Sequence, residues 1–248
     1  MKIKRLISSA IVWFIIGITL ILFFLIYIVL WFISLPFDRN KYFVQRLTQL
    51  WIDFYIYVFP FWEIAVIDKH KIVKGRPCIA VSNHQSLLDI AMLFHIYGYF
   101  VWVSKIENFR FPVIGWVMSL NHYVCLDRNN PKTFPKMFEG ISKAIMNKKT
   151  VMIFPEGTRS KNSELGRFKE GAFKAAIENK SPILPIVLDG TGRAIPKEGM
   201  LISRKSKVTI KVLDLIPYES FPSHEPVVLK EYVKGIIASE LENIRNNA

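Results

Sequence analysis

The sequence predicts an α/β fold, in which a mostly parallel sheet is flanked by helices and preceded by an N-terminal hairpin of two membrane-associated helices. Residues 6–37 contain no charged side chain. Beyond about residue 64, short β-branched or apolar runs alternate with helical patterns, which is typical of a parallel sheet. The mean hydropathy of the 248-residue chain, +0.26, is high for a freely soluble domain. We therefore expect a membrane anchor over residues 1–63 and an α/β domain over residues 64–248.

The first helix is long enough to cross a bilayer, because about 20 apolar residues suffice. A cleavable signal peptide has a shorter apolar region of roughly 7–15 residues, followed by a small-residue cleavage site. Residues 6–37 show no such site, so we expect the segment to be retained. Lysine and arginine flank it at both ends, and the positive-inside rule therefore gives no orientation.

Residues 42–62 predict a second, amphipathic helix that Pro60 should end near Phe59. Its apolar side chains recur at helical spacing in one stripe: Leu47, Trp51, Phe54, Val58 and Trp62. The aromatic content suits the headgroup level of a bilayer. Alternatively, the stripe packs on the globular domain. The expected hairpin either dips into the membrane or crosses it.

The α/β region is expected to contain alternating strands and helices. The strands are predicted at 78–82, 100–104, 123–126, 151–154, 183–188 and 208–212. The helices are predicted at about 87–97, 134–147, 170–179 and 229–246. Such sheets bind ligands outside the carboxyl ends of their strands, in the loops that lead into helices.

A histidine and an aspartate lie at the first of these loops. The strand at 78–82 runs through Asn83 into His84, and a helix should begin at about Ser86, a good capping residue. Within one helix, residues five apart point about 140° away from each other. His84 and Asp89 can therefore meet only if His84 precedes the helix and Asp89 lies in its first turns. The pair would make an oriented general base, or a purely structural histidine–carboxylate contact.

A second candidate loop follows the strand at 151–154 and is expected at the same edge of the sheet. It contains Glu156 and Gly157, a glycine that permits close approach of a ligand. Thr158 offers a hydroxyl and Arg159 a guanidinium suited to phosphate. The alternative is a polar turn with an exposed arginine.

Two further cations end predicted strands. Lys105 follows the strand at 100–104, and Arg128 follows the strand at 123–126. Both would add positive charge to the same edge of the sheet, unless Asp127 neutralises Arg128 locally.

These stretches together resemble the glycerophospholipid acyltransferase family, most closely its 1-acylglycerol-3-phosphate acyltransferases. The resemblance spans roughly residues 79–188 and rests on Asn83-His84 with Asp89, on residues 105–128, on residues 154–160 and on residues 183–187. It implies an acyl thioester donor, carried by acyl carrier protein or coenzyme A, and lysophosphatidic acid as acceptor. Glycerol 3-phosphate or another lysolipid is the alternative acceptor.

The resemblance also implies roles for individual residues. His84 would be the base, Asp89 its orienter, and Glu156 to Arg159 the headgroup site. A direct attack of the acceptor hydroxyl on the thioester needs no protein nucleophile, and no Gly-x-Ser-x-Gly motif occurs in the chain. Backbone amides at the start of the helix after His84 are candidate oxyanion donors. The five histidines show no metal-ligand spacing, and we expect neither a metal nor a cofactor.

The net charge of +13 is compatible with two anionic partners, nucleic acid or an anionic membrane surface. No nucleic-acid-binding motif stands out, and a membrane accounts for both the charge and the apolar composition. We therefore expect no nucleic acid, while a membrane-tethered nucleic-acid binder and a non-catalytic lipid-binding relative remain alternatives. The two cysteines give no indication of an oxidising compartment. We expect the catalytic domain on the cytoplasmic side of the cell membrane.

One more loop, residues 190–204, mixes apolar and basic side chains, among them Ile195, Met200, Ile202 and Arg204. It either touches the bilayer near the path of the acceptor or is an ordinary solvated loop.

Overall fold

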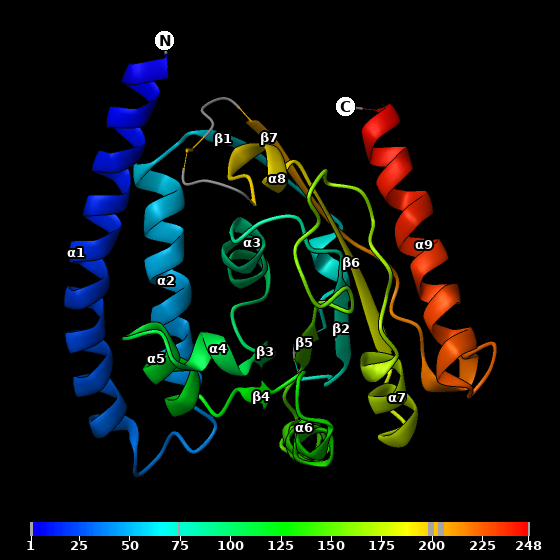
Figure 1. Ribbon diagram of the computed structural model, residues 1–248. Helices are drawn as coiled ribbons and strands as arrows, with labels where there is room; N and C mark the ends of the chain where they lie inside the picture. The colour runs from blue at the N-terminus through cyan, green and yellow to red at the C-terminus, as the bar shows by residue number, and fades with distance from the viewer. Residues whose placement is uncertain (1, 74, 198–200, 203–205, 248) are drawn as a thin grey trace.

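The structure, a computed structural model, describes residues 2–73, 75–197, 201–202 and 206–247, with the backbone alone for residues 2–5. In this part of the chain a single seven-stranded sheet lies at the centre, with helices on both faces (Figure 1). The long helix α1 runs along one side of the molecule and the C-terminal helix α9 along the opposite side. The α/β fold expected from the sequence is confirmed.

The sheet is parallel except at one pair of strands. Its order is β1-β7-β6-β2-β5-β3-β4, and only β6 and β7 pair antiparallel. The strands are β1 (Trp62–Ile67), β2 (Ile79–Ser82), β3 (Val101–Lys105), β4 (Val124–Leu126), β5 (Val151–Ile153), β6 (Ile183–Asp189) and β7 (Ser206–Val212). Every residue of the central strands β2 and β6 is buried, as expected for a parallel sheet covered on both faces. The sequence analysis missed β1, a half-exposed edge strand that begins one residue before the expected domain boundary.

The helices include three short ones that the sequence patterns did not indicate: α4 (Ile106–Phe109), α5 (Ile114–Leu120) and α8 (Thr191–Ala194). Segments of four to seven residues are too short to show a helical period. The remaining helices are α1 (Lys2–Ser34), α2 (Tyr42–Val58), α3 (Leu88–Tyr97), α6 (Phe134–Met146), α7 (Gly171–Glu178) and α9 (Pro226–Asn246). Contacts join α6, α7 and α9 into one layer, while α2, α3 and α8 form the other.

The helix α1 lies along the domain instead of projecting from it. Its span Leu6–Ser34 is long and apolar enough to cross a membrane, which suggests membrane association. Near one end, Ser9 Oγ accepts a hydrogen bond from the backbone amide of Ile202 at 3.0 Å. Further along, the Phe23 ring stacks on Trp51 of α2 at a centroid distance of 4.3 Å, and Tyr27 is fully buried.

The second helix, α2, is sandwiched between α1 and α3. Leu47 and Trp51 of its apolar stripe pack against the α1 cluster, whereas Phe54 and Val58 are 49% and 42% exposed. Trp62, the last residue of the predicted stripe, lies in β1, because α2 ends at Val58. Leu47 and Trp51 thus pack within the protein, while Phe54 and Val58 face outward.

The opposite side of α2 attaches to the α/β domain through polar contacts. Gln45 Oε1 accepts from the Phe100 amide at 3.1 Å, and Gln49 donates to the His95 carbonyl at 3.2 Å. The Asp53 carboxylate lies 2.7 Å from Nδ1 of His95. These contacts hold the hairpin against α3, the helix that carries Asp89.

Candidate active site

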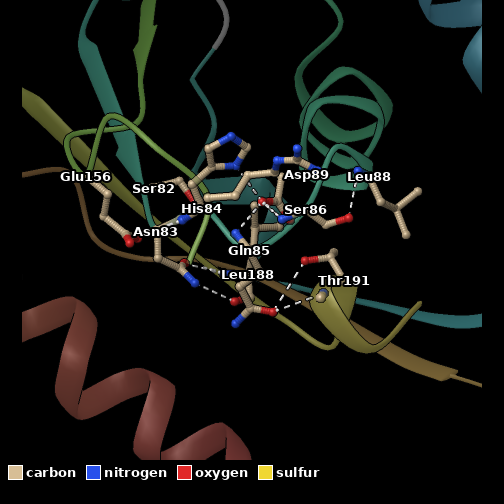
Figure 2. Close-up of polar contacts among 12 residues, drawn as sticks. Ser82, Asn83, His84, Gln85, Ser86, Leu88, Asp89, Glu156, Leu188 and Thr191 are labelled. Atoms are coloured by element: carbon tan, nitrogen blue, oxygen red, sulfur yellow. Dashed lines mark hydrogen bonds and ion pairs between the residues drawn. The ribbon is translucent and has the colours of Figure 1, made fainter. Parts of the chain in front are cut away.

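The loop between β2 and α3 brings His84 and Asp89 together (Figure 2). His84 Nδ1 lies 2.7 Å from Asp89 Oδ2. The same oxygen accepts hydrogen bonds from the backbone amides of Gln85 at 2.6 Å and Ser86 at 2.8 Å. Asp89 is fully buried, so this carboxylate has no solvent around it and is held by these three donors. A carboxylate on Nδ1 keeps the proton there and leaves Nε2 of the neutral imidazole as the basic nitrogen.

The local sequence accounts for this geometry. The strand ends at Ser82, and α3 begins at Leu88, two residues later than expected. The N-cap position of α3 is Leu87 and not Ser86, although the Ser86 Oγ accepts from the Leu88 amide at 3.2 Å at the start of the helix. Asp89 then lies in the first turn of α3, where the helix dipole favours a negative charge. The backbone amides of Gln85 and Ser86, which directly follow His84, donate to Asp89 and are therefore not free to act as oxyanion donors.

The carboxyl end of β6 anchors the loop on both sides of His84. The Asn83 amide group pairs with the Leu188 backbone, donating at 2.7 Å and accepting at 2.8 Å. The buried Gln85 donates to Asp189 at 3.3 Å, and Asp189 also accepts from Arg245 at 3.1 Å. Sequence analysis assigned no role to Gln85, Asp189 or Arg245. Because Arg245 is 56 residues beyond Asp189, no local pattern indicates this contact.

An aromatic stack holds the imidazole from one side. The His84 ring lies parallel to Phe154, with a centroid distance of 3.9 Å and an interplanar angle of 5°. Phe154 in turn stacks on Trp102 at 5.2 Å. The histidine side chain remains 13% exposed, so one part of the ring is accessible to a substrate.

Glu156 connects the two candidate loops. Its Oε1 accepts from the His84 amide at 2.8 Å, and its Oε2 accepts from the Gly166 amide at 3.1 Å. Burial raises the pKa of this carboxyl to about 7, although the two backbone hydrogen bonds act in the opposite direction. Both carboxyl oxygens are thus engaged with the backbone of neighbouring loops.

Positive charge gathers around Gly157. Its φ of +73° suits glycine, and an added Cβ would lie 3.1 Å from the Arg128 guanidinium. Burial lowers the pKa of Arg128, whose Nε is buried without a hydrogen-bond partner. Burial, and next the charges of Arg128 and Lys105, lower the pKa of Lys169. Asp127, considered above as a partner of Arg128, accepts a hydrogen bond from the Asn129 amide at 2.9 Å. The candidate cations Lys105 and Arg128 lie close enough to Lys169 for their charges to act on it.

A cleft of about 500 Å³ adjoins this cluster. Thr158 and Arg159 line it, as do Arg167 and Lys169, which the sequence analysis did not single out. Thr158 is exposed and Arg159 partly exposed, so both are open to a ligand. Glu156, Glu170 and Ser160 also line the cleft. Its three cationic side chains outnumber the two carboxyl groups, so the cleft is suited to an anionic group.

In the loop after β6, the structure describes two of the four side chains named above. Ile195 and Ile202 are buried within the protein, with 8% and 4% exposure. Met200 and Arg204 lie outside the described residues. Across the described ranges, no group of three or more His, Cys, Asp or Glu side chains is arranged to hold a metal ion.

Comparisons with known proteins relate the chain to one enzyme family. The family model described as Acyltransferase matches residues 63–189. A chloroplastic 1-acyl-sn-glycerol-3-phosphate acyltransferase of Brassica napus is 38% identical over 171 residues, covering 67% of this chain and 49% of the relative. A 1-acyl-sn-glycerol-3-phosphate acyltransferase of Chlamydomonas reinhardtii is 33% identical over 211 residues, covering 84% and 61%. The chain thus spans about half to three-fifths of the length of these relatives.

A solved structure shares the fold along nearly the whole chain. The 1-acyl-sn-glycerophosphate acyltransferase PlsC of Thermotoga maritima superposes with a TM-score of 0.81. The alignment covers 98% of this chain and 97% of the other, at 23% sequence identity. The likeness includes the N-terminal helices, because so little of either chain is left unmatched.

Proposed function

Since the chain belongs to the acyltransferase family, we propose that it transfers a fatty acyl group from a thioester to the free hydroxyl of 1-acylglycerol 3-phosphate, forming phosphatidic acid. The observation that carries the proposal is the His84–Asp89 pair, 2.7 Å apart, next to a cationic cleft. The printed names of the relatives state the same activity for those proteins. The donor thioester is carried by acyl carrier protein or coenzyme A.

His84 acts as general base in this proposal. Its Nε2 takes the proton of the acceptor hydroxyl while the hydroxyl oxygen attacks the thioester carbonyl. The tetrahedral intermediate then collapses, the carbon–sulfur bond breaks, and the leaving thiolate takes the proton back from the imidazolium. Asp89 stabilises that imidazolium through its contact with Nδ1. A base of this kind contributes about 10²–10⁴-fold to the rate.

The acceptor phosphate binds in the cationic cleft. Arg159 lines the cleft, and Lys105 and Arg128 stand close enough to Lys169 to lower its pKa. Grouped cations of this kind are relieved of their mutual repulsion when a dianionic phosphate binds. Gly157 leaves the Arg128 guanidinium room to reach the ligand.

Glu156 and Thr158 support the same subsite in different ways. Glu156 joins the His84 loop to the loop at Gly166, so it fixes the base relative to the phosphate cleft. Thr158, exposed at the cleft, offers its hydroxyl to the glycerophosphate.

The N-terminal unit, residues 1–63, anchors the enzyme to an anionic membrane surface. Contacts at Ser9 and Tyr27 join α1 to the rest of the protein over 18 residues, or about 27 Å of helix. A helix held in this way along a folded domain lies in the plane of the membrane, with its exposed apolar side chains toward lipid. We place residues 64–248 on the cytoplasmic side of the cell membrane.

The test is incubation of the protein with labelled lysophosphatidic acid and each thioester donor, followed by identification of the product. Phosphatidic acid should form, and His84→Ala should lower its rate at least about 100-fold while the protein stays folded. His95→Ala is the matched control: His95 also contacts an aspartate at 2.7 Å, but that aspartate is Asp53 of α2, whereas the His84 amide donates to Glu156 of the cleft. Equal losses in both variants would contradict the role of His84.

Arg159→Ala tests the headgroup subsite. Removal of this guanidinium should raise the KM for lysophosphatidic acid about tenfold, the loss expected of one charge-assisted contact worth roughly 1.4 kcal/mol. The KM of the thioester donor should not change. An unchanged acceptor KM would exclude Arg159 from the phosphate site.

A further inference from the structure

A short apolar segment stands exposed at the start of α5. Phe111, Ile114 and Trp116 have 59%, 50% and 52% of their surface exposed. They lie within six consecutive positions of the chain, residues 111–116. Large apolar side chains exposed together on a surface mark a site of interaction with another apolar body.

The backbone of this segment is held in a strained and rigid form. Val113 has φ +64° and ψ −62°, the angles of a strained γ-turn, which β-branched residues rarely adopt. The Ile114 amide donates to the Pro112 carbonyl at 2.7 Å and closes a three-residue turn. Directly behind it, a Cβ on Gly115 would lie 2.1 Å from the Phe109 carbonyl oxygen, so α4 and α5 meet backbone to backbone. Strain of this kind persists where the surroundings enforce it, and it concentrates at functional positions.

The segment continues the apolar surface of α1. The Trp116 ring lies 5.4 Å from that of Phe24. On the inner side of α5, Val117 and Leu120 pack against the cluster formed by α1 and α2. Figure 1 shows α4 and α5 beside α1 and α2, on the side of the molecule away from α9. Because α5 contacts α1 at Phe24 and at the neighbouring cluster, the exposed side chains at its start lie beside the apolar surface of α1.

Positive charge borders the segment. Arg110, which is exposed, directly precedes Phe111, and Lys105 is the N-cap of α4, while the exposed Glu107 between them leaves a net charge of +1. Cations beside exposed apolar and tryptophan side chains suit the anionic headgroup region of a bilayer. This combination favours a lipid surface over an uncharged protein partner.

We propose that residues 111–116 form a third membrane contact, in which Phe111, Ile114 and Trp116 insert between lipids beside α1. The inference rests on the proposed function for its consequence: insertion would hold Lys105, which lies six residues before Phe111 and close to Lys169 of the cleft, near the acceptor headgroup. The membrane contact itself needs no catalytic activity and is tested separately.

The contact is tested with an environment-sensitive fluorophore in the full-length protein. The label is attached at Ile114→Cys in a chain that also carries Cys125→Ser, since Cys125 is the exposed cysteine. Vesicles of phosphatidylcholine with phosphatidylglycerol should shift its emission to the blue. The same label at Val227→Cys on α9, a position 49% exposed on the far side of the molecule, should show no shift. No shift at Ile114→Cys, or a shift that depends on protein concentration without vesicles, overturns the proposal.

The consequence for activity is tested with two forms of the acceptor. The double variant Phe111→Ser/Ile114→Ser should raise the apparent KM for acceptor embedded in vesicles about tenfold and leave the KM for a monodisperse short-chain acceptor unchanged. Val227→Ser/Val228→Ser, another exposed apolar pair, should change neither KM. An equal rise with both acceptors overturns the proposal. Absence of activity in the wild-type chain contradicts the proposed function instead, while the fluorescence result still decides the membrane contact.

Discussion

Replacement of Glu156 by glutamine should remove a pH dependence from the stability of the fold. Glu156 is 7% exposed, and burial raises its pKa from 4.5 to about 7. In the unfolded chain the carboxyl releases its proton near pH 4.5, whereas the folded protein retains it up to about pH 7. The stability that this group contributes is therefore fully present below pH 4.5 and is lost as the pH rises through 7.

The size of the effect follows from the two pKa values. With 1.36 kcal/mol per unit, the shift from 4.5 to about 7 corresponds to roughly 3 kcal/mol in total. Between pH 5 and pH 8 the loss is about 2.5 kcal/mol, because part of the unfolded population has already ionised at pH 5. A glutamine carries no proton to release, so the variant lacks this component at every pH.

The assay is urea unfolding in detergent micelles at pH 5 and pH 8, for the wild-type chain and for Glu156→Gln. The difference in the free energy of unfolding between the two pH values should be about 2.5 kcal/mol smaller in the variant. Glu139→Gln, an exposed glutamate on α6, is the control and should reproduce the wild-type difference. Identical pH dependence in the wild type and Glu156→Gln would refute the reasoning, because the buried carboxyl would then titrate alike in both states.

Two further substitutions test how the site is held. Gly157→Ala places a Cβ 3.1 Å from the Arg128 guanidinium at a φ of +73°, so the acceptor KM should rise severalfold in steady-state assays while the donor KM stays constant. Arg245→Met removes one donor from the buried carboxylate of Asp189, which accepts from Gln85 of the His84 loop, so kcat should fall at constant KM. Glu240→Gln removes the ion pair with Lys211, a second contact between α9 and the sheet, and should leave kcat and KM unchanged. Equal effects of Arg245→Met and Glu240→Gln would assign Arg245 a structural role only.

The sequence was most informative where a structural feature depends on neighbours along the chain. The alternation of strand and helix predicted a mostly parallel sheet, and six of its strands lie within two residues of the expected positions. The approach of His84 to Asp89 followed from a strand that ends just before a helix begins, because only that transition lets residues five apart meet. The family resemblance is confirmed by the match over residues 63–189.

The order of the strands in the sheet decides which distant residues meet at the site, and no local sequence pattern contains that order. Because β2 pairs with both β5 and β6, the His84 loop meets Glu156 on one side and Asp189 on the other. Glu156 lies 72 residues after His84, whose amide it binds, and Asp189 lies 104 residues after Gln85, whose side chain it binds. Lys169 joined the cationic group, and Arg245 reached Asp189, through the same tertiary arrangement.

The chain by itself determined its apolar helix, its alternating elements and the turn that makes the histidine–aspartate pair, since these depend on periodicity and on the short reach between adjacent residues. Only the folded molecule decided that α1 lies back along the domain, that the exposed segment 111–116 stands beside it, and that Lys105 and Arg128 lie close to Lys169 of the cleft. Such contacts depend on which strands lie next to each other and on how helices pack over them, and that choice is made by burial of the whole apolar surface at once.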